Sequence, residues 1–284
     1  MRLLQVDDSG KLHLIEHAGR DTPPYAVLSH TWGADGDEVT YKDIVEGEGK
    51  SKPGYRKLSF CAKQAASDGL GLFWVDTCCI DKTSSAELSE AINSMFRWYA
   101  NASKCYVYLS DVSVDSAKGK GQLPRATGVP SFQRSRWFTR GWGLQELLAP
   151  KSVGFYSAEG EYLGDRKSLI QEIQTITGVS SKALEGSPLS HFSVEERKSW
   201  AANRDTKREE DADTVYWEYS AFSCQLFMEK ATMLSKGCRK KLKSHFANLA
   251  SAVACLQSYL PSFHAAERFV ARTLSLNIRP LPVP

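Results

Sequence analysis

The chain has 284 residues, of which 42% are hydrophobic and 11% aromatic, so it can bury a sizeable core and does not have the composition of a disordered chain. A formal net charge of +3 is too small to indicate nucleic-acid binding by itself. Seven cysteines, an odd number with Cys78 and Cys79 adjacent, do not match a secreted disulfide framework. We read no signal peptide at residues 1–14 and no membrane span elsewhere, and therefore expect a cytoplasmic protein.

Short apolar runs alternate with amphipathic stretches along the chain. Residues 1–15 alternate loosely around Asp7-Asp8-Ser9-Gly10, which predicts a β-hairpin. We expect buried strands at residues 25–30, 72–80, 104–110 and 153–156, and helices at residues 55–69, 84–100, 142–148 and 167–177. This order predicts an α/β fold, in which helices flank one mainly parallel sheet. Ser84 and Glu87 have the spacing of a capping box at the start of the second helix.

Residues 135–150 combine two tryptophans, two arginines and a glutamate just before Pro150. If residues 142–148 are helical, Trp142 and Glu146 lie four residues apart on one face. An aromatic ring beside a carboxylate on an exposed face is a plausible ligand site. The alternative is that Trp142 packs in the core and Glu146 only favours the positive helix N-terminus.

Polar side chains also follow the expected strands. In an open α/β sheet, ligands bind outside the carboxyl ends of the strands. His30 and Trp32 leave the strand at residues 25–30, and Asp76 comes late in the run at residues 72–80. We therefore expect these side chains near Glu146. Two alternatives stay open: His30 can be a satisfied histidine at the rim, and Asp76 can cap the loop that follows.

Cysteine chemistry is a weaker interpretation. Cys78 or Cys79 with His30 and Asp76 has the residue types of a cysteine protease, but a Cys-Cys pair inside a buried strand is typical of core packing. No Cys-x-x-Cys or His-x-x-x-His spacing indicates a zinc site, and we expect no metal.

Several long motifs resemble, in the same order, the fungal heterokaryon-incompatibility (HET) domain. These motifs are residues 25–33, 74–82, 84–99 and 136–150, with weaker similarity at residues 192–197 and 208–211. The resemblance implies a filamentous fungus and a role in cell death after fusion of incompatible hyphae, or in related innate self/non-self defence. It also implies a distant relation to TIR domains, and hence a TIR-like or flavodoxin-like sheet.

The run from Trp142 to Leu147 resembles a Trp-Cys-Leu-Asp-Glu-Leu run of plant TIR domains, in which the glutamate is needed to cleave NAD+. The resemblance therefore implies Glu146 as the catalytic residue and NAD+ as a substrate, with no bound cofactor. Cleavage of the nicotinamide–ribose bond forms an oxocarbenium-like centre that a carboxylate stabilises. Trp142 would stack on a ring of the dinucleotide, and Arg136 and Arg140 would meet its phosphates.

His30, Trp32 and Asp76 complete the expected substrate-binding set. The alternative for both arginines, Arg136 and Arg140, is solvated surface.

We expect four parts in the chain: an N-terminal hairpin at residues 1–23, the HET domain at 24–190, a family extension at 191–212 and a tail at 213–284. The tail holds nine Lys or Arg and four Asp or Glu, a net charge of +5. The family pattern stops after Asp211. When residues 215–241 are back-translated with permissible codons and read in a shifted frame, the result can contain the Leu-Leu-Gly-Ile-Phe and Leu-Tyr-Gly-Glu-Gly motifs that normally follow in the family. We therefore interpret the tail as irregular, frameshifted and poorly packed.

Two function classes remain. In the first, the protein is an enzyme that consumes NAD+ through Glu146. In the second, it is a non-enzymatic module that triggers cell death by assembling with other HET domains or an upstream sensor, as a homo-oligomer on activation. The spacing of Trp142 and Glu146 favours the enzyme, and the lack of a recognisable phosphate-binding loop favours the module. Neither class involves nucleic acid.

Overall fold

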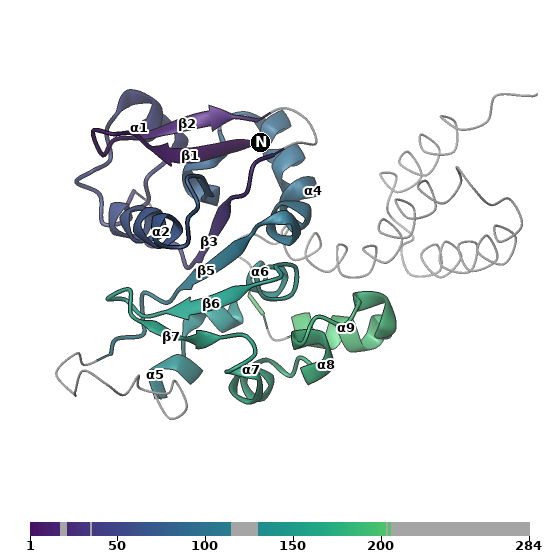
Figure 1. The fold of residues 1–284 in the computed structure, drawn as a ribbon. Coiled ribbons are helices and arrows are strands. Elements are labelled where there is room, and N and C mark those ends of the chain that lie inside the picture. The colour runs from purple at the N-terminus through teal and green to yellow at the C-terminus, as the bar shows by residue number, and fades with distance from the viewer. Residues whose placement is uncertain (18–21, 35, 115–129, 203, 206–284) are drawn as a thin grey trace, which may run out of the picture. The chain divides into compact units, whose positions relative to one another are not determined.

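The computed structural model describes residues 1–17, 22–34, 36–114, 130–202 and 204–205, which form one mixed sheet covered by helices (Figure 1). In this part of the chain the sheet has seven strands in the order β2-β1-β4-β3-β5-β6-β7. The strands are β1 (Arg2–Val6), β2 (Leu12–Glu16), β3 (Ala26–His30), β4 (Phe73–Trp74), β5 (Lys104–Tyr108), β6 (Val153–Tyr156) and β7 (Tyr162–Asp165).

The four strands β4, β3, β5 and β6 run parallel, which confirms the predicted mainly parallel sheet. All five residues of β3 are buried, as expected for an apolar strand that is covered on both faces. The predicted N-terminal hairpin is also confirmed, and it joins the main sheet because Leu4 pairs antiparallel with Phe73. The antiparallel edge strand β7 was not predicted.

The helices lie in two layers. In the described residues they are α1 (Tyr41–Glu46), α2 (Tyr55–Ser67), α3 (Asp76–Cys79), α4 (Ser85–Asn101), α5 (Pro130–Gln133), α6 (Gly143–Leu148), α7 (Ile170–Thr177), α8 (Ser181–Leu184) and α9 (Val194–Ala201), with 3₁₀ turns at Arg136–Thr139 and Leu189–His191. Helix α2 lies on one face of the sheet, and α4 and α6 contact each other on the opposite face (Figure 1). In the sheet, β4 lies on one side of β3, whereas β5 and β6 lie on its other side. Because crossovers between parallel strands are right-handed, this reversal of direction puts the helices before and after β4 on opposite faces of the sheet.

The strand predicted at residues 72–80 is wrong over most of its length. Only Phe73 and Trp74 pair as β4, and the chain turns into α3 at Asp76. The Val75 carbonyl accepts the N–H of Cys79 at 2.9 Å, which closes one helical turn. An apolar run of this length is compatible with a short buried helix as well as with a strand, so its periodicity could not distinguish the two.

Only half of the predicted capping box forms at the start of α4. The Ser84 hydroxyl accepts the backbone N–H of Glu87 at 3.3 Å, as expected for an N-cap. The Glu87 carboxylate instead pairs with Arg2 and accepts the N–H of Asp81 at 2.8 Å. The glutamate therefore ties α4 to β1.

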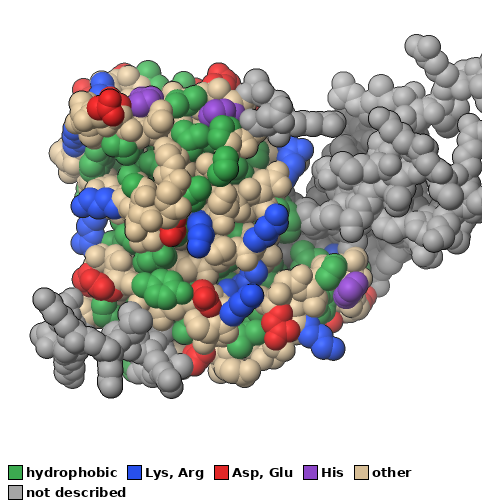
Figure 2. Space-filling model, viewed as in Figure 1, with side chains coloured by type: hydrophobic (Ala, Val, Ile, Leu, Met, Phe, Trp, Pro, Cys, Tyr) green, Lys and Arg blue, Asp and Glu red, His purple; other side chains and the backbone are tan. Residues whose placement is uncertain are grey.

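The predicted basic tail at residues 213–284 lies outside the described residues. In the part that is described, none of the helices has the length and apolar character needed to cross a bilayer. On the face shown in Figure 2, Lys and Arg side chains are interspersed with Asp and Glu, so this face does not present charge of a single sign.

Candidate functional site

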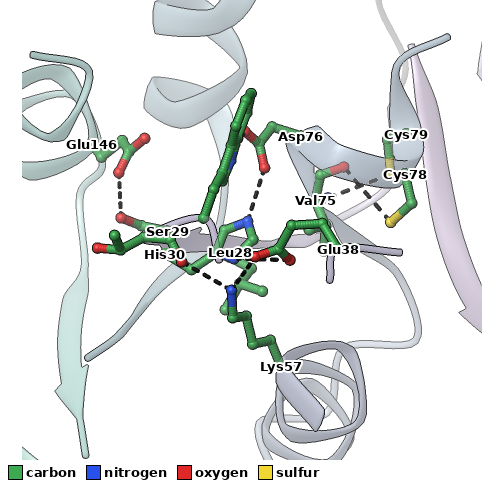
Figure 3. Close-up of polar contacts among 12 residues, drawn as sticks. Leu28, Ser29, His30, Glu38, Lys57, Val75, Asp76, Cys78, Cys79 and Glu146 are labelled. Atoms are coloured by element: carbon green, nitrogen blue, oxygen red, sulfur yellow. Dashed lines mark hydrogen bonds and ion pairs between the residues drawn. The ribbon is translucent and has the colours of Figure 1, made fainter. Parts of the chain in front are cut away.

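Two adjacent residues at the end of β3, Ser29 and His30, organise the polar cluster of this sheet. Both are buried, with 0% and 2% of their surface exposed. Because side chains alternate along a strand, they point to opposite faces of the sheet. Ser29 points toward Glu146 of α6, and His30 lies beside Asp76 and above Lys57 of α2 (Figure 3). The cluster therefore has two halves on either side of β3.

The first half joins β3 to α6 through hydroxyl and carboxylate groups. The Ser29 hydroxyl donates to Glu146 Oε2 at 2.5 Å and accepts the indole N–H of Trp137 at 2.7 Å. Trp137 is fully buried and contacts the rings of Phe138 and Phe155, so it cannot easily move. This packing fixes the hydroxyl that holds the glutamate.

Arg140 neutralises Glu146. Its Nη1 lies 3.1 Å from Glu146 Oε2, and the two side chains are only 20% and 5% exposed. Burial lowers the pKa of Arg140, but the charges of Glu146 and Asp76 outweigh burial and hold that pKa above its usual value. The buried carboxylate thus has a firmly charged partner.

The expectation that Glu146 lies on an exposed helix face is wrong, because the residue is only 3% exposed. All six residues of α6 are buried, since α4, α8 and the preceding 3₁₀ turn surround this short helix. Trp142 lies one turn earlier, at the N-cap of α6, and packs partly buried against the core. The backbone N–H of Glu146 donates to the Trp142 carbonyl at 3.3 Å.

The second half gathers around Asp76. One oxygen of this carboxylate lies 3.0 Å from His30 Nε2, and the other accepts the indole N–H of Trp32 at 2.9 Å. The Lys82 ammonium lies 3.7 Å from the centroid of the Trp32 ring. Burial raises the pKa of Asp76, but the hydrogen bond and charge of His30, with Lys82 and Arg140, hold that pKa well below its usual value. Asp76 is therefore ionised at neutral pH.

The structure thus brings His30, Trp32 and Asp76 together, as their positions at strand exits predicted. It places Glu146 with Arg140 in the other half, and the electrostatic interaction between Asp76 and Arg140 links the two halves. This arrangement is a buried row of charged and polar groups at the carboxyl edge of β3.

Glu38 and Lys57, which were not predicted as site residues, complete the second half of the cluster. Lys57 pairs with Glu38 and donates to the carbonyl of Thr31 at 2.9 Å. The other oxygen of Glu38 lies 4.0 Å from His30 Nδ1, so His30 stands between two carboxylates. Burial raises the pKa of Glu38, but His30 and Lys57 outweigh it and the pKa falls below its usual value. No local signal in the sequence marks Lys57, because it lies off the apolar stripe that contains Leu58 in the predicted helix.

The vicinal cysteines are in the core. Both are buried in α3, and the thiol of Cys78 lies 3.9 Å from the carbonyl of Val75. Burial raises the pKa of Cys78 well above its usual value, which disfavours the nucleophilic thiolate. Asp81 caps the following turn by accepting the N–H of Thr83 at 3.0 Å. Within the described ranges, no group of three or more His, Cys, Asp or Glu is arranged to hold a metal ion.

The fold and its polar cluster define an α/β protein with a buried row of charges at the carboxyl edge of its parallel strands. Residues 25–131 match the family described as "Heterokaryon incompatibility protein (HET)". The chain is also 55% identical over 217 residues to "Vegetative incompatibility protein HET-E-1" from Podospora anserina. It is therefore a fungal HET-domain protein.

The similarity to that relative involves 74% of this chain but only 15% of the relative's length. Most of that protein therefore has no counterpart in the alignment with this chain. No solved structure matches the chain significantly.

Proposed function

We propose that this protein is an effector of fungal heterokaryon incompatibility and cell death, and that it acts by cleaving NAD+ at the nicotinamide–ribose bond. The first part rests on the HET match and on the similarity to a relative that is named a vegetative incompatibility protein. Because the chain spans about 15% of that relative, the relative's whole role is not transferred by similarity alone.

The observation that supports the enzymatic part is the buried Glu146 carboxylate at the carboxyl edge of β3. In the reaction, the bond between ribose C1′ and the nicotinamide nitrogen breaks, and its electron pair leaves with neutral nicotinamide. A carboxylate in a poorly solvated site stabilises the resulting cationic sugar strongly. Water then adds to C1′ and loses a proton, which yields ADP-ribose. No general acid is needed, because the leaving group is already cationic.

Arg140 and the second half of the cluster supply groups for the rest of the dinucleotide. In the present arrangement the Arg140 guanidinium is paired with Glu146. A pyrophosphate is a natural alternative partner for that guanidinium, and its binding would free the carboxylate. Trp142 and Trp32 offer rings for stacking, and His30 and Asp76 offer hydrogen bonds to a ribose.

A specific observation favours a second function. Glu146 is 3% exposed and paired with both Arg140 and Ser29, so it is closed to solvent in this structure. A closed cluster of this kind is compatible with a purely structural role, in which it holds β3, α6 and the 3₁₀ turn together. In that case the domain acts as a signalling module, whose assembly with other HET domains, with an upstream sensor or with copies of itself triggers cell death.

The two functions are separated by incubating the full chain with NAD+ and measuring free nicotinamide by liquid chromatography. The enzyme proposal expects release by the wild type and loss of release in Glu146→Gln. Glu195→Gln is the matched control, because Glu195 is an exposed carboxylate in the first turn of α9. If Glu146→Gln remains folded and still kills cells, charge on Glu146 is not the mechanism and the assembly function is supported.

A further inference from the structure

A short segment near the end of the described chain crosses the loop that carries Arg140. The N–H of Asp205 donates to the carbonyl of Thr139 at 2.6 Å, and the N–H of Gly141 donates to the carbonyl of Asp205 at 2.8 Å. Together these bonds form a parallel β-bridge between Arg140 and Asp205. The backbone on both sides of Arg140 is therefore held by a residue that is 65 positions away in sequence.

Arg204 adds a side-chain contact to the same loop. Its Nη1 donates to the carbonyl of Arg140 at 3.0 Å, and its Nε donates to the carbonyl of Trp200 in α9 at 3.2 Å. Gly143 makes room for this contact, because a Cβ there would lie 3.3 Å from Arg204 Nη1 and 2.9 Å from the carbonyl of Trp137. Arg204 thus connects α9, whose Trp200 is buried, to the backbone of Arg140.

Arg140 is the residue whose guanidinium pairs with the Glu146 carboxylate. Residues 204 and 205 hold the backbone of Arg140 in place, and they therefore also determine where its guanidinium lies relative to the Glu146 carboxylate. We infer that residues 204–205 form a strap that keeps Arg140 on Glu146, and that release of the strap opens the Glu146 site. Its importance for activity rests on the proposed function, but its effect on Glu146 does not.

The strap is well placed for regulation. It contacts the loop through three hydrogen bonds that involve the backbone of residues 139–141. Loss of one such bond shifts a local opening equilibrium by about fivefold. The strap therefore depends on a small number of backbone contacts, each of which a single substitution can remove.

Chemical footprinting of carboxylates tests the strap on the full chain. A water-soluble carbodiimide with glycine ethyl ester labels accessible carboxylates, and mass spectrometry measures the labelling rate of Glu146. Arg204→Ala removes the side-chain bond, and Asp205→Pro removes the N–H that binds Thr139. We expect each variant to raise labelling of Glu146 about fivefold, while circular dichroism stays that of the folded protein.

Asp205→Asn is the matched control, because it keeps both backbone bonds of the strap and should leave labelling unchanged. Lys182→Ala, which removes an exposed cation on α8, should also have no effect. Hydrogen exchange at the N–H of Gly141 reports independently on whether the strap has opened. If that exchange accelerates while Glu146 labelling does not change, or if neither changes in either variant, the inference is overturned.

Footprinting uses no NAD+, so its result does not depend on the proposed enzyme. Measuring nicotinamide release in the same two variants then separates the two ideas. Faster labelling together with faster release supports both the strap and catalysis by Glu146. Faster labelling without any release supports the strap and contradicts the enzyme.

Discussion

Replacing Glu146 by Gln should destabilise the fold, because it leaves Arg140 without its closest counter-charge. Removing one partner of a fully buried ion pair costs about 3–5 kcal/mol. Here Arg140 is 20% exposed and also interacts with Asp76, which reduces the expected cost to about 2 kcal/mol. For a domain of this size, that loss lowers the melting temperature by about 4–8 °C.

Thermal unfolding of the full chain, followed by circular dichroism, measures this loss. A double-mutant cycle with Arg140→Met should show a coupling of about 1–2 kcal/mol between the two side chains, because they are in direct contact. The exposed control Glu195→Gln should change stability by less than about 0.5 kcal/mol. A melting temperature of Glu146→Gln within about 1 °C of the wild type would refute the reasoning, and would instead fit the exposed glutamate that sequence alone predicted.

Three further predictions concern the scaffold. Ser84→Ala removes the N-cap of α4 and should cost about 1 kcal/mol in urea unfolding. Burial raises the pKa of Glu159, but hydrogen bonds from two serine hydroxyls and a backbone N–H outweigh it and hold the pKa at about 2. The folded pKa is therefore below the unfolded one, so the wild type should be more stable than Glu159→Gln above about pH 4.5, and this difference should disappear as the pH falls to about 2. Gly164→Ala should cost more than about 1 kcal/mol, because φ is +145° and the new Cβ would lie 2.9 Å from Leu169, whereas Gly71→Ala has open space and should be tolerated.

The elements that sequence predicted correctly are those determined by local chemistry. The hairpin turn needs Gly10, which has a φ of +78°, and the Asp7 carboxylate accepts the N–H of Ser9 at 2.9 Å. The apolar run of β3 needs cover on both faces, and this requirement predicts a central parallel strand. Because the carboxyl ends of parallel strands lie at the same edge of a sheet, the contact between His30 and Asp76 was also predictable.

The environment of Glu146 was decided only by the tertiary structure. Spacing along a helix shows which residues share a face, but not what covers that face. The partner of Glu146 is Ser29, 117 positions away, and helix α6 is buried by α4 and α8, which come from other parts of the chain. The backbone carbonyl of Arg140 likewise accepts a hydrogen bond from Arg204, which is 64 positions away. Local patterns therefore predicted the helix that carries Glu146. The burial and ion pairing of this residue depend on contacts between distant parts of the chain, which local patterns do not show.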